Sequence, residues 1–326
     1  MEQAGCRIVR HYRHMAYMGF AAVVANLAEV RRNFRIAEST LRQEQPDVLI
    51  LIDYPTFNLK IAAFCRRHLP RTKIVYYIPP KIWAWKGWRI HRIGRLCDLV
   101  LGIFPFEPKY YKERGYTCTY VGNPTVEELQ NCKFTNQQIC KSANIAVVPG
   151  SRRSEIVHCL PVMLEAARQH GKHIVVTTAP GIEDNLYTPY LHAGEELCHD
   201  TRRAVAEAEL AIVNSGTATL ETALIGTPQI AVYHLAWSRL LGILRPLQRT
   251  VFPLPYFTLP NILLDRPLIP ELLANEFTAE RISAEISRLT NDKTTLQRMQ
   301  SGYEQLRLVL GTQSASDTAA SLITNP

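Results

Sequence analysis

Short apolar segments that alternate with helical patterns constrain the fold of this chain more than any other sequence feature. They recur between stretches of helical periodicity such as Phe20–Gln43 and Val157–His170. The segments predict strands at Val48–Ile52, Ile74–Ile78, Leu99–Ile103, Thr119–Val121, Ile145–Val148, His173–Thr177, Leu210–Val213 and Gln229–Tyr233. Strands that are apolar along their whole length are typical of parallel sheets with helices on both faces. The pattern therefore predicts an α/β fold.

The length of the chain indicates two such units. Its 326 residues are enough for two domains, each with its own hydrophobic core. A predicted strand ends at Gly122-Asn123-Pro124, and a polar stretch follows before the next strand. We therefore predict a first domain over residues 1–135 and a second, with the carboxy-terminal helices, over residues 136–326. Tandem parallel-sheet domains typically bind a ligand in the cleft between them, beyond the carboxyl ends of the strands.

The net positive charge of the chain limits the classes of molecule that it is expected to bind. The sequence has a formal net charge of +8, which suits nucleic acid, an anionic membrane surface or a phosphorylated substrate. The sequence shows no heavy Lys/Arg run, zinc-binding pattern or aromatic RNA-binding strand, which argues against nucleic acid. It has no apolar stretch long enough to span a membrane, and its first residues lack the apolar region of a secretory signal. We therefore expect a cytoplasmic protein.

The cysteines give no sign of a metal site. Eight of them are scattered along the chain without a C-x-x-C or His-flanked pair. Metal sites and disulfide frameworks need closer or more regular spacing, so reduced thiols are expected. We predict no metal ion and no cofactor.

The segment NSGTATLE, residues 214–221, is the strongest candidate for a ligand site. An apolar strand runs into a turn of small residues, and a helix follows. Gly216 lets the backbone approach a ligand closely, and Glu221 can accept hydrogen bonds from ribose hydroxyls. Three hydroxyls lie beside the free N–H groups of the helix start, a setting that suits a diphosphate: those of Ser215, Thr217 and Thr219. An ordinary capped helix start explains the same residues equally well.

A second strand ends in Pro149-Gly150-Ser151-Arg152 and opens a helix in the same way. The planar guanidinium of Arg152 can bind phosphate oxygens, beside the backbone of Gly150 and Ser151. The alternative is a capped loop with solvated arginines. Two such elements in one predicted domain favour the ligand site.

Asp53 is the candidate catalytic residue. It follows the apolar strand Val48–Ile52 directly, in the segment IDYPTFN. A carboxylate at the carboxyl end of a buried strand is placed where a general base would act. The competing interpretation is that Asp53 caps the next helix or binds local backbone.

Two segments combine aromatic, basic and apolar residues. Three of the four tryptophans lie within six residues, and the arginines that follow are interleaved with apolar positions. A second segment, residues 233–261, has no acidic residue. We predict acceptor binding or peripheral attachment to an anionic membrane through Trp83, Trp85, Arg89, Arg92, Arg239 and Arg245. Packed core helices with a basic outer face would show the same pattern.

Together these motifs resemble the lipid-A-disaccharide synthase family. The family pattern IDxPxFN is found around Asp53, its VSPxxWAW segment is similar to residues 78–85, and IGRxxDLVLxxxPFE matches residues 93–107. Further along, PGSRxxE matches residues 149–155, SGTATLE matches residues 215–221, and SLPNLLAGRxLVPELLQ resembles residues 258–273. The matches are colinear and cover almost the whole chain, so the combination is specific.

The resemblance implies a GT-B fold, with two Rossmann-like domains that face each other across a cleft and UDP held by the second. It implies transfer of 2,3-diacylglucosamine from UDP-2,3-diacylglucosamine to 2,3-diacylglucosamine 1-phosphate (lipid X) by an inverting glycosyltransferase in lipid A biosynthesis. Asn261 becomes a further candidate substrate-binding residue. The expected location is the cytoplasmic face of the inner membrane, and formation of a homo-oligomer is left open. The alternatives are another GT-B enzyme of UDP-N-acetylglucosamine, either a 2-epimerase or a cell-wall transferase, and an inactive UDP-binding remnant.

The sequence departs from the family at its start. The family begins with a strand and a glycine-rich SGExSGDxxG loop, whereas Met1-Glu2-Gln3-Ala4-Gly5 resembles a segment that follows that loop. We therefore expect the first sheet to lack its first strand, which would expose the edge of the neighbouring strand.

Overall fold

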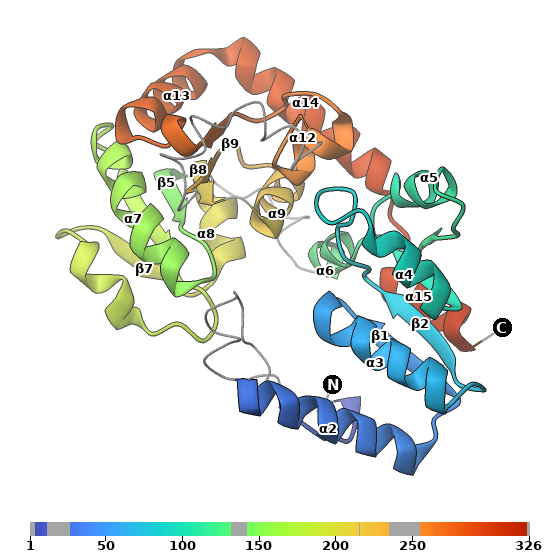
Figure 1. Cartoon of the computed structure of the whole chain (residues 1–326). Helices are drawn as coiled ribbons and strands as arrows, with labels where there is room; N and C mark the ends of the chain where they lie inside the picture. Colours follow the sequence, from blue (N-terminus) through green and yellow to red (C-terminus); the bar gives the residue numbers. More distant parts are fainter. Residues whose placement is uncertain (1–3, 12–26, 132–141, 215, 235–254, 325–326) are drawn as a thin grey trace. The chain divides into compact units, whose positions relative to one another are not determined.

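The computed structural model describes residues 4–11, 27–131, 142–214, 216–234 and 255–324 (Figure 1). The chain divides into two compact units. The first comprises Met1–Gly102, Glu107–Tyr120 and Ser321–Pro326, and the second comprises Ile103–Phe106 and Val121–Ala320. The predicted domain boundary at residue 135 lies outside the described residues.

The first unit contains a four-stranded parallel sheet. Its strands are β1 (Val48–Ile52), β2 (Lys73–Tyr77), β3 (Leu99–Gly102) and β4 (Thr119–Tyr120), in the order β1-β2-β3-β4. Its helices are α2 (Leu27–Glu44), α3 (Pro55–His68), α4 (Arg89–Leu96) and α5 (Glu107–Lys112). Each strand reaches its neighbour through a helical connection, as parallel pairing requires.

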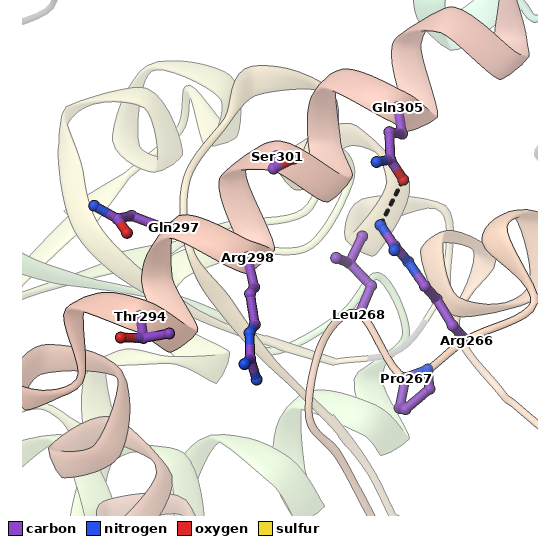
Figure 2. Close-up of a pocket in the computed structure, with 8 residues that line it drawn as sticks. All are labelled: Arg266, Pro267, Leu268, Thr294, Gln297, Arg298, Ser301 and Gln305. Carbon is purple, nitrogen blue, oxygen red and sulfur yellow. Dashed lines mark hydrogen bonds between the residues drawn. The ribbon is translucent and has the colours of Figure 1, made fainter.

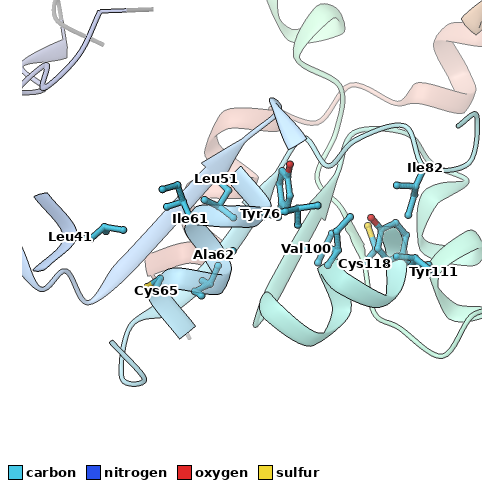
Figure 3. Packing of buried hydrophobic residues seen from close by; sticks show 14 residues of the cluster. Leu41, Leu51, Ile61, Ala62, Cys65, Tyr76, Ile82, Val100, Tyr111 and Cys118 are labelled. Atoms are coloured by element: carbon cyan, nitrogen blue, oxygen red, sulfur yellow. The ribbon is translucent and has the colours of Figure 1, made fainter. Parts of the chain in front are cut away.

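The core of this unit forms where α3 and α4 pack against the sheet (Figure 3). Leu51, Tyr76 and Val100 contribute from the three longer strands, while Ala62 and Cys65 face them from α3. The buried thiols behave as small apolar groups. Burial raises the pKa of Cys118 to about 12, so this thiol stays protonated at neutral pH.

Among the described strands, β1 forms one edge of this sheet. Leu51 is buried, but Ile50 and Ile52 are each 45% exposed. The fully apolar sequence of β1 predicted burial on both faces. In the described part of the chain only one face of this strand is covered.

The second unit contains a six-stranded parallel sheet. Its strands are β5 (Ser142–Val148), β6 (His173–Thr177), β7 (Glu196–Cys198), β8 (Ala208–Asn214), β9 (Gln229–Tyr233) and β10 (Glu271–Leu273). They lie in the order β10-β9-β8-β5-β6-β7. The chain therefore leaves β5 in one direction through β6 and β7, and returns to the other side of β5 with β8. The carboxyl ends of β5 and β8 mark the point where the strand order reverses, which is where open parallel sheets bind ligands.

Helices cover this sheet and continue to the carboxyl end. The α-helices are α6 (Pro124–Asn131), α7 (Arg153–Arg168), α8 (Thr201–Glu207), α9 (Thr217–Ile225), α12 (Leu259–Leu264), α13 (Ala279–Asn291) and α14 (Lys293–Leu310). A last helix, α15 (Ala315–Thr324), begins in the second unit and ends in the first. Three short 3₁₀ helices are η4 (Asp184–Leu186), η5 (Thr188–Tyr190) and η6 (Ala274–Glu276). Pro161 lies inside α7. The buried residues of this helix form one apolar face, which packs against the sheet.

The predicted α/β fold with parallel sheets is confirmed. The strands predicted at Val48–Ile52, His173–Thr177 and Gln229–Tyr233 have the same bounds in the structure, and the other five differ at their ends. The sequence missed β7 and β10, because three residues are too few to show a period. Residues 20–26 of the first predicted helix lie outside the described residues.

Candidate functional site

The carboxyl ends of β5 and β8 bring the two predicted glycine turns together. The strands pair in parallel, with Val148 opposite Val213, so the turn that follows each strand lies at the same edge of the sheet. Asn214, only 3% exposed, donates from Nδ2 to the carbonyl of Pro149 at 3.0 Å. This bond ties the end of β8 to the turn after β5. The sequence pointed to both turns, but not to the side chain that couples them.

The two glycines of these turns serve different purposes. Gly150 has φ +111°, and a Cβ there would lie 2.7 Å from Asn214 Nδ2 and 2.7 Å from Glu155 Oε2. Gly216 has φ +150°, and a Cβ there would meet no atom of the described residues within 4 Å. Both backbones therefore need glycine. Gly150 permits close packing within the protein, whereas Gly216 borders open space from which a ligand can approach.

The turn before α7 already holds a carboxylate. The backbone N–H groups of Ser151 and Arg152 each donate to Glu155 Oε2 at 3.2 Å, and the guanidinium of Arg152 pairs with Glu155 Oε1. This turn is thus an anion-binding element that is filled by its own glutamate. The Arg152 side chain is half exposed, so further N–H donors of its guanidinium face solvent.

The start of α9 is more open. Its N-cap residue is Gly216, and no side chain caps the helix. Thr217 is exposed, while the buried Thr219 donates its hydroxyl to the carbonyl of Gly216 at 2.9 Å. Thr217 is therefore available to a ligand and Thr219 shapes the turn. Ser215 lies outside the described residues.

Glu221 is held by an arginine that the sequence analysis did not identify. Arg202 donates from Nε to Glu221 Oε1 at 2.6 Å and also pairs with Glu128. Desolvation lowers the pKa of Arg202, but its hydrogen bonds to Glu221 and Glu128 outweigh this effect and raise the pKa overall. Arg202 therefore orients the carboxylate of Glu221 on the first turns of α9. Arg202 lies 19 residues earlier on another helix, so no local pattern linked the two.

Asn261 lies within the protein rather than at a surface. It is 1% exposed, and its Oδ1 accepts from the N–H groups of Leu268 and Ile269 at 2.8 and 2.9 Å. Its Nδ2 donates to the Ile269 carbonyl at 3.0 Å and to Glu271 at 2.9 Å. These bonds use the hydrogen-bonding capacity of the amide. Asn261 therefore fixes the loop between α12 and β10, and we assign it no ligand contact.

In the first unit, the turn at the end of β1 is strained. Asp53 and Tyr54 have φ +45° and +38°, and the β-branched Ile78 at the end of the neighbouring β2 has φ +56°. Such conformations cost about 1–3 kcal/mol each and persist only where other contacts impose them. Asn58 Nδ2 donates to the carbonyls of Ile52 at 2.9 Å and Asp53 at 2.6 Å. The hydroxyl of Tyr76 also donates to the Asp53 carbonyl, at 2.8 Å.

These contacts hold the backbone of Asp53 and leave its carboxylate at the surface. Tyr54 is the N-cap residue of α3, and no side chain caps that helix. Lys81 lies near Asp53: desolvation lowers the pKa of Lys81, while the charges of Asp53 and Glu107 act in the opposite direction. An exposed carboxylate in this position can take a proton from a bound hydroxyl.

The aromatic segment after β2 divides into a buried and an exposed part. Trp83 is 5% exposed and donates from Nε1 to the buried Glu107 at 3.1 Å, so it packs inside the unit instead of at the predicted surface. Trp85 and Trp88 are 51% and 63% exposed. A cation lies over each of these two rings. Lys86 Nζ is 5.5 Å from the centroid of the Trp85 ring, and the Arg89 guanidinium is 5.8 Å from the centroid of the Trp88 ring.

Two arginines of this segment form hydrogen bonds with α3. Arg89 donates to Thr56 Oγ1 and Arg92 to the carbonyl of Leu59, each at 3.3 Å. Both therefore connect the segment to α3. Arg239 and Arg245 lie outside the described residues. Among the helices that the structure describes, none has the length and apolar character needed to cross a membrane.

The structure is similar to solved sugar-nucleotide enzymes. The UDP-N-acetylglucosamine 2-epimerase of Neisseria meningitidis, solved with bound UDP-GlcNAc, has a TM-score of 0.62 at 10% identity, covering 95% of this chain and 83% of that one. MurG of Acinetobacter baumannii has a TM-score of 0.53 at 16% identity, with 98% and 83% covered. At such identities the likeness shows the fold alone, and that fold is GT-B.

The sequence comparisons show the family. A family model described as lipid-A-disaccharide synthetase matches residues 1–324. The lipid-A-disaccharide synthase of Trichlorobacter lovleyi is 32% identical over 342 residues, covering 99% of this chain and 86% of the relative. The enzyme of Geobacter sulfurreducens is 29% identical over 341 residues, with the same coverage. The chain belongs to the lipid-A-disaccharide synthase family of glycosyltransferases, as its motifs predicted.

Proposed function

We propose that the chain transfers 2,3-diacylglucosamine from its UDP derivative to the 6-hydroxyl of 2,3-diacylglucosamine 1-phosphate, with inversion at the anomeric carbon. The products are a β-1,6-linked disaccharide 1-phosphate and UDP. The observation that carries the site assignment is the pair of glycine turns at the ends of β5 and β8, coupled by Asn214 where the strand order reverses.

The donor diphosphate is assigned to the open start of α9. Its free N–H groups and the positive end of the helix dipole favour an anion at Gly216 and Thr217. Arg152, on the neighbouring turn, supplies a guanidinium to the same edge of the sheet. Glu221, fixed by Arg202, is the acceptor for ribose hydroxyls.

The same groups favour the chemical step. As the glycosidic bond breaks, the sugar becomes oxocarbenium-like and UDP gains negative charge. Donors that are already oriented stabilise this charge without reorganising during the reaction. Asn214 and Glu155 hold the β5 turn in place before any ligand binds, so the remaining guanidinium donors of Arg152 are oriented in advance.

Asp53 is the proposed general base for the acceptor hydroxyl. An unassisted hydroxyl is a poor nucleophile, and a positioned base removes its proton as the bond forms. The turn fixes the backbone of Asp53 through Asn58 and Tyr76, while the carboxylate remains exposed. Burial raises the pKa of Tyr76, so its hydroxyl stays a donor to this turn.

Attachment to the cytoplasmic face of an anionic inner membrane is the second part of the proposal. Trp85 and Trp88 expose large aromatic surfaces, with Lys86 over the Trp85 ring and Arg89 over the Trp88 ring. Aromatic side chains insert at the headgroup level of a bilayer, and cations next to them are attracted to anionic lipid. Such attachment would bring the enzyme to its acylated substrates.

Product analysis tests the reaction directly. The chain is incubated with UDP-2,3-diacylglucosamine and 2,3-diacylglucosamine 1-phosphate, and the disaccharide 1-phosphate is detected by mass spectrometry. Parallel incubations with UDP-N-acetylglucosamine, with and without a cell-wall acceptor, test the epimerase and cell-wall transferase activities. Formation of the disaccharide with the first pair alone supports the proposal. Turnover of UDP-N-acetylglucosamine in place of the acylated donor would contradict it.

A further inference from the structure

A hollow of about 540 Å³ lies on the second unit, between α14 and the loop that follows α12 (Figure 2). The loop contributes Arg266, Pro267 and Leu268. One face of α14 lines the other side, with Arg298, Ser301 and Gln305 at intervals of three and four residues, a spacing that places them on one side of a helix. None of these residues belongs to the turns after β5 and β8.

The hollow is formed by the protein itself. Asn261 holds the backbone of the loop at Leu268 and Ile269. Leu268 packs directly on Gly302 of α14, where a Cβ would lie 2.0 Å from Leu268 Cδ1. Any larger residue at 302 would push the loop away. The loop is therefore fixed against the helix, and the shape of the hollow does not depend on a ligand.

The charge in this hollow is positive and uncompensated. Arg266 donates to the neutral amide oxygen of Gln305 at 2.6 Å, and Arg298 makes no hydrogen bond or ion pair with the described residues. Among the residues that the structure describes, no carboxylate lines the hollow. By contrast, Arg307 on α14 and Arg288 on α13 each pair with a glutamate three residues away.

The nearby acid Asp292 does not neutralise this charge. Its carboxylate caps α14, accepting from the N–H groups of Thr294 and Thr295 at 3.0 and 3.1 Å. It also accepts from the Thr295 hydroxyl at 2.5 Å. The two guanidinium groups of the hollow thus remain open to an external anion.

We propose that this hollow is a second anion-binding site, for a phosphate group. Guanidinium groups match the geometry of phosphate oxygens, and Arg266 is already oriented by Gln305. Ser301 adds a hydroxyl donor from the same face of α14, and Leu268 provides an apolar surface next to the cations (Figure 2). The phosphate can belong to a phospholipid headgroup or to a soluble phosphorylated compound, since the same groups recognise both.

Calorimetric titration of the whole chain with inorganic pyrophosphate at low ionic strength tests the site. Arg298→Gln and Arg266→Gln should each weaken binding about tenfold or more, since each removes a charged hydrogen-bond donor. The matched control is Arg281→Gln, an exposed arginine on α13 that is 3.8 Å from Glu276 and does not line the hollow. It should change the affinity by less than about twofold.

The titrations are repeated in the Arg152→Ala background, because the turn before α7 is itself an anion-binding element. The loss caused by Arg298→Gln should be equally large in that background. No loss in either background, or a loss only where Arg152 is present, overturns the proposal. A thermal midpoint close to that of the unsubstituted chain shows that Arg298→Gln is folded.

Vesicle flotation then identifies the source of the phosphate. Vesicles of phosphatidylcholine alone are compared with vesicles that also contain phosphatidylglycerol. If Arg298→Gln weakens both pyrophosphate binding and flotation with phosphatidylglycerol, the site takes a lipid headgroup. If it weakens pyrophosphate binding alone, the site takes a soluble phosphorylated compound. Weaker flotation with unchanged pyrophosphate binding would overturn phosphate recognition.

Discussion

Replacing Asp53 with asparagine removes the ability to accept a proton and leaves the turn at the end of β1 otherwise intact. The contacts that impose the strained conformation involve the carbonyl of Asp53, which accepts from Asn58 and Tyr76, and not its carboxylate. Asparagine tolerates a positive φ as readily as aspartate does, so φ +45° at position 53 adds no new strain. The variant should therefore keep its stability within about 0.5 kcal/mol.

Turnover should respond very differently. Positioned general-base assistance contributes roughly 10²–10⁴-fold in rate, equivalent to about 3–5 kcal/mol in the activation barrier. Asp53→Asn should lower kcat by about that factor, while the affinity for UDP is unchanged because the donor groups belong to the second unit. Turnover, thermal midpoint and UDP affinity are measured on one preparation.

The matched control is Asn58→Ala, which loosens the same turn but keeps the carboxylate. It removes two hydrogen bonds to the backbone, so it should lower stability by about 1 kcal/mol. Because Asn58→Ala keeps the carboxylate at position 53, its kcat should fall far less than that of Asp53→Asn. Near-normal turnover of Asp53→Asn would refute the general-base assignment.

Three further predictions concern other parts of the chain. Arg152→Ala should weaken UDP binding by about 1.5–3 kcal/mol, and Glu221→Gln should also weaken it, as measured by calorimetry. Unchanged affinity in both variants would show that the nucleotide binds elsewhere. Trp85→Ala and Trp88→Ala should lower flotation with anionic vesicles severalfold at low salt, and equal recovery with and without anionic lipid would exclude attachment there. Desolvation, and then the neighbouring His158, lower the pKa of His234 below its ordinary 6.5. As the pH falls below 6.5, the unfolded chain therefore binds more protons than the folded chain, and the free energy of unfolding should fall. Chemical denaturation should show a less steep fall for His234→Gln.

The strands could be predicted because each contains a run of consecutive apolar residues. Val48–Ile52 is apolar throughout and Gln229–Tyr233 has Ile, Ala and Val at its centre, and the structure has both strands with the predicted bounds. Burial of single residues outside regular elements could not be predicted in this way. Trp83 and Trp85 are two positions apart in one aromatic segment, yet Trp83 is 5% exposed and Trp85 is 51% exposed. Trp83 donates to the buried Glu107, which lies 24 residues further along the chain. Pairings of that kind depend on tertiary structure and leave no local period.

The candidate donor site shows the same division between local and long-range information. The turns at Gly150 and Gly216 follow from local chemistry, because a strand, a glycine and a helix start are visible in sequence. Their juxtaposition depends on the strand order, in which β8 returns beside β5, and the sequence alone does not set that order. The bond from Asn214 to Pro149 also depends on this strand order, since the two residues are 65 positions apart in the sequence.

Substitutions at Asn214 should therefore affect the site through the position of the β5 turn. Asn214→Ala removes the bond to the Pro149 carbonyl but changes no charge, and the space left beside Gly150 is small. A buried carbonyl without its donor costs about 1–3 kcal/mol, so the turn should shift to regain a partner. UDP affinity should fall in Asn214→Ala and should fall little further when Arg152→Ala is added, because the displaced turn already misplaces that arginine. Fully additive losses in this double-mutant cycle would show that Asn214 and Arg152 act independently and would contradict the coupling.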